Sequence, residues 1–144
     1  MMSRGWTAGL AAGLLLNVLG WIGNQLVLGR MWRTTVSTVT PLRQRTLFNE
    51  LLSLVPDFVY GIALAWLFLV LVSAGRDRRT AAWQAALLVW AVGAMTTYLG
   101  VWNSGLVPGG LAVATTLLAL VTFVPTSWVV ARLLKMPAPA AVTR

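Results

Sequence analysis

The sequence contains no cysteine and no histidine, and only three of its residues, Glu50, Asp57 and Asp77, are acidic. Disulfides, thiolate nucleophiles, imidazole acid-base chemistry and the usual axial ligands of haem are therefore excluded. Three scattered carboxylates offer few ligands for a metal ion. No nucleophile with a paired base can be assembled from the remaining residues. We predict a protein that is not an enzyme and that holds no metal and no cofactor.

Charged residues are also scarce, at 10% of the 144 residues, whereas hydrophobic residues make up 58%. An average soluble domain is about 25% charged, so an ordinary soluble fold is excluded. A membrane-spanning helix needs about 20 apolar residues. Four apolar runs meet this need, at residues 5–29, 54–75, 81–102 and 111–134. The sequence predicts an all-α polytopic membrane protein with four transmembrane helices in an antiparallel bundle.

The chain divides into a four-helix transmembrane domain, residues 1–136, and a Pro/Ala-rich tail, residues 137–144. Within the domain, residues 31–50 have mixed composition and predict a loop followed by a short interfacial helix. The second run begins near Leu51 or Pro56, and proline is favoured in the first turn of a helix, where its missing N–H costs nothing. The basic link at residues 76–79 is short enough to force a helix hairpin.

A net charge of +8 raises the question of nucleic acid binding. The cations lie in small groups at the ends of apolar runs, where anionic lipid head groups and topology signals account for them. We therefore predict membrane lipids as partners and no nucleic acid. With both termini in the cytoplasm, seven cations fall inside (Arg4, Arg76, Arg78, Arg79, Arg132, Lys135 and Arg144) and four outside (Arg30, Arg33, Arg43 and Arg45). This bias predicts an N-in, C-in protein of the bacterial inner membrane.

Small and polar residues form one stripe along the first predicted helix. Gly13, Asn17, Gly20 and Asn24 recur at spacings of four, three and four, and Gly9 completes a GxxxG pair with Gly13. Glycines allow two helices to approach closely, and asparagine can form hydrogen bonds across such a contact. The stripe predicts an interface for helix packing, either within this bundle or with a second copy or a foreign helix.

A polar cluster is predicted near the outer surface. Asn24, Tyr60, Thr97 and Thr115 each lie about five residues inside a different helix, which is roughly 8 Å at 1.5 Å per residue. Asp57 is predicted nearer the surface, within reach of Arg30 or Arg33. Ionisable residues in a membrane are functional candidates, and two interpretations of Asp57 stay open: a structural ion pair or helix N-terminal charge, and a proton relay.

Three segments carry a family resemblance: GLLLNVLGWIGNQLVLGRMW, DFVYGIALAWLFLVL and the basic link GRDRRTA. With a final apolar span, this pattern resembles small four-helix inner-membrane proteins of bacteria. The resemblance covers most of the chain and implies an inner-membrane bundle. That family has no assigned catalytic or binding residues, so no residue role is implied.

Two functions remain as hypotheses. The first is a non-catalytic accessory or structural subunit of a larger inner-membrane assembly, such as a respiratory or photosynthetic one, because the sequence lacks catalytic chemistry and offers much contact surface. Its partners are other membrane protein subunits, with a homo-oligomer left open. The alternative is a small oligomeric channel or small-molecule carrier that uses the outer polar cluster.

Overall fold

The computed structural model describes residues 2–36 and 47–134, and these residues form helices and short turns with no strand. In chain order the helices are α1 (Met2–Leu26), α2 (Gly29–Val36), α3 (Leu47–Ser73), α4 (Arg78–Val89), the π-helical η1 (Trp90–Met95), α5 (Thr96–Asn103) and α6 (Gly109–Leu133). The prediction of an all-α fold is confirmed.

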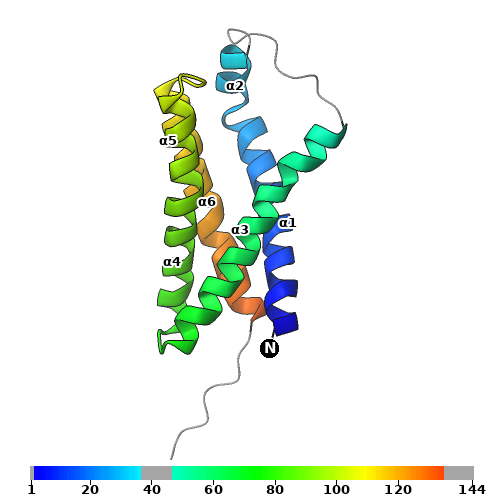
Figure 1. Cartoon of the computed structure of the whole chain (residues 1–144), viewed down its shortest axis with the longest axis vertical. Helices are drawn as coiled ribbons and strands as arrows, with labels where there is room; N and C mark the ends of the chain where they lie inside the picture. The colour runs from blue at the N-terminus through cyan, green and yellow to red at the C-terminus, as the bar shows by residue number, and fades with distance from the viewer. Residues whose placement is uncertain (1, 37–46, 135–144) are drawn as a thin grey trace, which may run out of the picture.

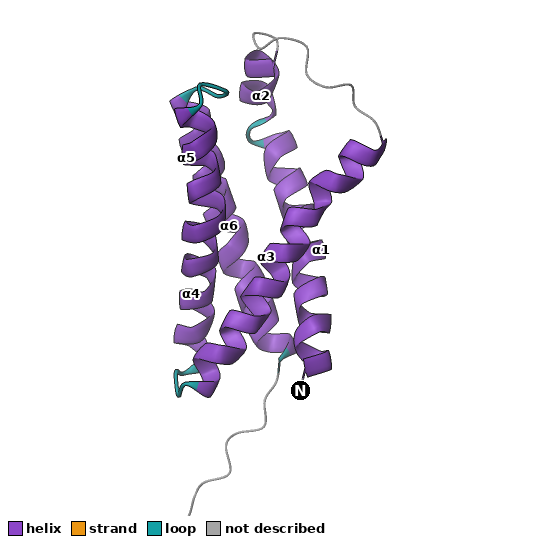
Figure 2. Ribbon diagram, viewed as in Figure 1, coloured by secondary structure: helices purple, strands orange, loops and turns teal. Residues whose placement is uncertain are grey.

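Four helices of the described chain are long and apolar enough to cross a membrane: Arg4–Leu26, Leu51–Ser73, Arg78–Asn103 and Gly109–Leu133. The third of these consists of α4, η1 and α5, which follow one another without a break. Successive spans run in opposite directions, and they pack side by side as a bundle (Figures 1 and 2). The predicted four-helix bundle is therefore confirmed.

The two ends of the bundle differ in how closely the helices approach (Figure 1). At the closed end lie the start of α1, the α3–α4 turn and the end of α6. The open end holds α2, the α5–α6 turn and the first turns of α3, which lean away from the other helices. Buried side chains of the core, among them Phe68, Ala82 and Val130, pack between the helices at the closed end.

Small side chains let the helices meet at the closed end. Four alanines on one face of α4 are fully buried: Ala81, Ala82, Ala85 and Ala86. The hydroxyl of Ser127 on α6 is also buried and donates a 2.7 Å hydrogen bond to the backbone carbonyl of Ala82. Close backbone approach of this kind provides packing contacts that are available inside a membrane, where lipid tails are as apolar as the side chains.

The basic link between α3 and α4 has a structural role. Asp77 is the N-cap of α4 and accepts a 2.9 Å hydrogen bond from the backbone N–H of Thr80. Hydrogen bonding to the Thr80 side chain and backbone holds the pKa of this exposed carboxyl below its usual value. Arg78 donates hydrogen bonds to the carbonyls of Ala131 and Leu134, which end α6. This link therefore satisfies backbone groups at two helix ends.

A helix forms where the sequence predicts a loop. The first span ends at Leu26 rather than at residue 29, and α2 follows at once. The hydroxyls of Thr34 and Thr35 both donate 2.9 Å hydrogen bonds to the carbonyl of Met31, one turn back. Threonine-rich composition predicts a loop here, but inside a helix the hydroxyls of these threonines are satisfied by the preceding turn. The order of loop and short helix predicted for residues 31–50 is therefore wrong for the described part.

The second span begins at Leu51, one of the two starts that the sequence predicts, but its helix begins earlier. α3 begins at Leu47, so Pro56 lies inside the helix rather than in its first turn. Proline within a helix removes one backbone hydrogen bond, which membrane helices tolerate. Large apolar side chains on the turns before Pro56 are exposed, including Leu47, Phe48 and Leu51. Apolar residues thus extend α3 beyond the predicted boundary at residue 54.

Some predictions fall outside the described residues. These are the Pro/Ala-rich tail at residues 137–144, residues 37–46 of the predicted interfacial segment, and the cations Arg43, Arg45, Lys135 and Arg144.

Candidate ligand-binding cavity

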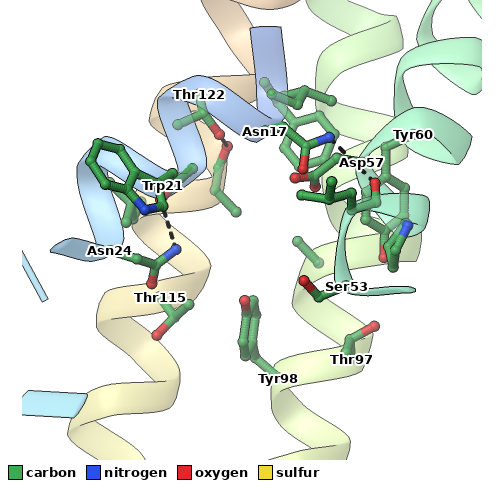
Figure 3. A pocket seen from close by; sticks show the side chains of 18 residues that line it. Asn17, Trp21, Asn24, Ser53, Asp57, Tyr60, Thr97, Tyr98, Thr115 and Thr122 are labelled. Carbon is green, nitrogen blue, oxygen red and sulfur yellow. Dashed lines mark hydrogen bonds between the residues drawn. The ribbon is translucent and has the colours of Figure 1, made fainter. Parts of the chain in front are cut away.

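A cavity of about 470 Å³ lies between the helices at the open end of the bundle. Its eighteen lining residues come from α1, α3, η1, α5 and α6 (Figure 3). Polar and aromatic side chains make up much of its wall: Asn17, Trp21, Asn24, Ser53, Asp57, Tyr60, Thr97, Tyr98, Thr115, Thr122 and Phe123. Cavities that hold small molecules are typically about 300–1,000 Å³, so this one has a suitable size.

All five residues of the predicted polar cluster line this cavity. Asn24 comes from α1, Asp57 and Tyr60 from α3, Thr97 from α5 and Thr115 from α6. The bundle thus brings side chains from four spans to one space. Figure 3 shows them around the opening between the helices, with Tyr98 beside Thr97.

The small-residue stripe of α1 has two different environments. A Cβ atom on Gly9 would lie 2.8 Å from the Cα of Ile62, and one on Gly13 would lie 2.6 Å from the Cα of Phe58. These two glycines therefore lie at a close crossing with α3. Gly20 is different, because the nearest atom to its Cβ position is an oxygen of Asp57 at 4.0 Å. The upper part of the stripe faces the cavity.

The two asparagines of the stripe are held by hydrogen bonds. The side-chain amide of Asn17 donates to the carbonyls of Gly13 at 3.0 Å and Leu54 at 3.3 Å, which ties α1 to α3. Asn24 donates to the carbonyl of Gly20 at 2.9 Å and accepts a 3.0 Å hydrogen bond from the indole N–H of Trp32. This second contact fixes α2 against the end of α1.

The threonine hydroxyls of the cavity wall donate to their own helices. Thr97 donates to the carbonyl of Gly93 and Thr115 to that of Leu111, both at 2.7 Å, and Thr122 donates to Ala119 at 2.8 Å. A hydroxyl has a single hydrogen but two lone pairs. Once the hydrogen is used, the hydroxyl oxygen can only accept. These three residues therefore present acceptors to the cavity.

Asp57 is deeper than the sequence predicts. Its carboxylate lies at the level of Gly20, six residues before the end of α1, which corresponds to about 9 Å at 1.5 Å per residue. Neither Arg30 nor Arg33 lines the cavity, and no ion pair of 4.0 Å or shorter joins Asp57 to either of them within residues 2–36 and 47–134. The predicted reach to these arginines is wrong, because α3 begins earlier and Asp57 occupies its third turn rather than its first.

Sequence reasoning missed several residues of the cavity wall. Tyr98, Ser53 and Thr122 line it, as do the aromatic rings of Trp21 and Phe123. The helix repeat carries a signal for two of them, since Trp21 follows Asn17 by four positions and Ser53 precedes Asp57 by four, on the same faces. Thr122 and Phe123 lie too far along α6 for a depth ranking from its first residue to include them.

The described residues contain no group of three histidine, cysteine, aspartate or glutamate side chains that could hold a metal ion. The described residues that line the cavity supply one carboxylate, hydroxyls, amides and aromatic rings. No protein-family model, curated protein or solved structure matches the chain. The chemistry of the cavity is therefore the basis for assigning a function.

Proposed function

We propose that this chain is a non-catalytic carrier or binding protein of the bacterial inner membrane, which takes a small molecule into the cavity at the open end of the bundle. The observation that supports this proposal is the convergence of polar residues from four spans on one space of about 470 Å³. A subunit that served only to fill space would gain stability from closing this space with apolar side chains, since packing drives helix association in membranes.

The N-in, C-in orientation makes the open end the outer end. This orientation belongs to the same proposal and is supported by the excess of cations at the closed end and the two termini. A carrier would then receive its ligand from the outer side of the membrane.

The accessory-subunit role is a second candidate, favoured by a different feature. The first turns of α3 lean away from the bundle (Figure 1), and Leu47, Phe48 and Leu51 on these turns are 73%, 69% and 55% exposed. A helix of a partner subunit could cover this apolar surface. Lipid can cover it equally well, so the surface supports this role less strongly than the cavity supports the carrier.

A cavity-filling substitution tests the carrier proposal. Leucine at position 20 would project into the cavity, because nothing lies closer than 4.0 Å to the Cβ position of Gly20. Leucine at position 100 is the matched control, since Gly100 is exposed and has no atom within 4 Å of its Cβ position. The two substitutions add the same side chain to a helix, one inside the cavity and one outside it.

The measurement is thermal stabilisation of the purified full chain by a set of cationic, neutral and anionic small molecules. We expect at least one class to stabilise the wild type and Gly100→Leu, and not Gly20→Leu. Ligands that stabilise all three proteins equally, or none of them, would contradict the carrier proposal and leave the accessory role.

A further inference from the structure

The carboxylate of Asp57 has no partner within the described residues. No hydrogen bond and no ion pair of 4.0 Å or shorter reaches it from residues 2–36 or 47–134, although its neighbours Asn17, Asn24 and Thr97 are all engaged in hydrogen bonds. It is also the only acidic residue within the four spans. An unpaired charge inside a membrane is costly, so it calls for a neutralising group.

The hydrogen-bonding groups of the cavity wall favour a ligand that donates hydrogen bonds. Thr97, Thr115 and Thr122 have already donated their hydrogens to backbone carbonyls, so their oxygens add acceptors around the carboxylate. No arginine or lysine among residues 2–36 and 47–134 lines the cavity. The hydroxyls of Tyr60 and Tyr98, which also line the cavity, are neutral donors and do not balance the charge of Asp57. An anionic ligand would therefore be repelled by the carboxylate, whereas an ammonium group would be attracted by it and could donate to the threonine oxygens.

Aromatic rings form the other part of the wall. Tyr60 and Phe123 lie edge to face with ring centroids 5.5 Å apart, and Trp21 and Tyr98 line the same cavity. The faces of aromatic rings attract ammonium ions, and cages of such rings recognise quaternary ammonium groups. The rings also suit an apolar body attached to the charge.

The number of charges and the volume limit the ligand further. A single carboxylate balances one positive charge. A bare monovalent ion would leave most of the 470 Å³ to water, whereas an organic cation would fill it and contact the aromatic rings.

We propose that the cavity is a binding site for a singly charged organic cation, an ammonium group on an apolar or aromatic body, with Asp57 as its counter-ion. This inference rests on the proposed function and names the ligand class of the same cavity. The ammonium group can belong to a free solute or to the headgroup of a lipid.

Three probes of similar shape test this class: benzylammonium, whose N–H groups can donate, its neutral isostere ethylbenzene, and the anion benzylsulfonate. Their dissociation constants are measured by calorimetry on the full chain in an uncharged detergent. We expect the cation to bind at least about tenfold more tightly than the neutral isostere, and the anion to bind most weakly. A neutral or anionic probe that binds as tightly as the cation would overturn the inference, and this comparison needs no variant.

Asp57→Asn removes the charge with little change in shape, and Asp77→Asn removes one charge from the exposed N-cap of α4 as a matched control. We expect Asp57→Asn to weaken binding of the cation at least about tenfold and to leave the neutral isostere unchanged, while Asp77→Asn changes neither. Unchanged cation binding in a folded Asp57→Asn variant would overturn the inference, because the carboxylate would then not be the counter-ion of the ligand.

Gly20→Leu separates failure of the ligand class from failure of the proposed function. If the neutral probe or the anion binds best and Gly20→Leu abolishes that binding, the cavity still binds a small molecule and only the ligand class is wrong. If no probe binds and no compound of the wider set stabilises the protein, both proposals fail.

Phosphatidylethanolamine added to the micelles competes with the cation if the site takes a lipid headgroup, and phosphatidylglycerol does not. A site for a free solute shows competition from neither lipid, and both results support a cation site.

Discussion

Glycines in one sequence stripe of α1 have different roles at the residue scale. Gly13 lies where the backbone of α3 comes closest, with Gly61 of α3 directly opposite. Gly20 is seven positions further along the same helix and borders open space beside Asp57. The absence of a side chain allows helix contact at the first position and leaves room for a ligand at the second.

This difference gives a prediction for two identical substitutions. Gly13→Leu should destabilise the bundle by about 2 kcal/mol or more, because its side chain would meet the Cα and ring of Phe58 at 2.6 Å. Gly20→Leu should cost little, within about 1 kcal/mol, since the cavity accepts the side chain and leucine favours helix more than glycine does. Thermal unfolding in detergent compares the two, and equal destabilisation would show that Gly20 is also at a packed contact.

The sequence predicts which residues form the stripe and the polar cluster, but not how the stripe is divided. Spacing places Gly13 and Gly20 on one face. Whether that face meets a helix or a cavity depends on the tilt of α3, which is a tertiary property. The same tilt determines the depth of Asp57, so a depth counted along the sequence alone placed it too close to the surface.

At the scale of elements, the ends of the helices show where sequence patterns succeed. The third and fourth spans, predicted at 81–102 and 111–134, are observed at Arg78–Asn103 and Gly109–Leu133. Both are bounded by polar or glycine-containing turns whose positive-φ residues, Gly75 and Gly105, end the preceding helices. For the second span the sequence predicts a start near Leu51 or Pro56, and the observed span starts at Leu51. Pro56 has the properties of a first-turn residue, but the apolar residues before it continue the helix back to Leu47.

The N-cap of α4 gives a prediction about pH. The pKa of Asp77 is lowered in the folded state by hydrogen bonding to Thr80, so its carboxylate stabilises the fold at neutral pH. This contribution is present above the unfolded-state pKa of about 4 and is lost as the pH falls through the lower folded-state pKa. Asparagine also caps helices but does not titrate. Between pH 7 and pH 3 the wild type should therefore lose more stability than Asp77→Asn.

Chemical unfolding at the two pH values measures this difference. The two proteins differ only at position 77, so the contributions of all other residues cancel in the comparison. The same loss of stability in both proteins would mean that the charge of Asp77 does not contribute to the cap.

At the scale of the whole molecule, the bundle is closed at one end and open at the other. Alanine-rich packing and the hydrogen bonds of Arg78 and Ser127 fix the closed end. The cavity occupies the open end, where α3 leans away (Figure 1). Hydrophobic composition predicts the number of helices and their alternation, because each span must be apolar along its length. It does not predict the asymmetry, which arises from how the side chains fit together.

The orientation of this asymmetric bundle can be measured, because the chain has no cysteine of its own. Ser104 lies in the α5–α6 turn and Ala74 in the α3–α4 turn, and both are exposed. With both termini in the cytoplasm, an impermeant maleimide added to intact cells should label Ser104→Cys and not Ala74→Cys. The reverse pattern would place the cavity on the cytoplasmic side.

The central claim is that the polar residues of four spans enclose a space that water and a cation can enter. Thr97 and the adjacent Thr96 are both exposed, but of the two only Thr97 lines this space. The most direct test is the rate at which a cationic, water-soluble methanethiosulfonate modifies Thr97→Cys and Thr96→Cys in membranes. The two positions differ by about 1.5 Å in depth. We predict rapid modification of Thr97→Cys and little of Thr96→Cys, and equal rates at both positions would contradict the claim.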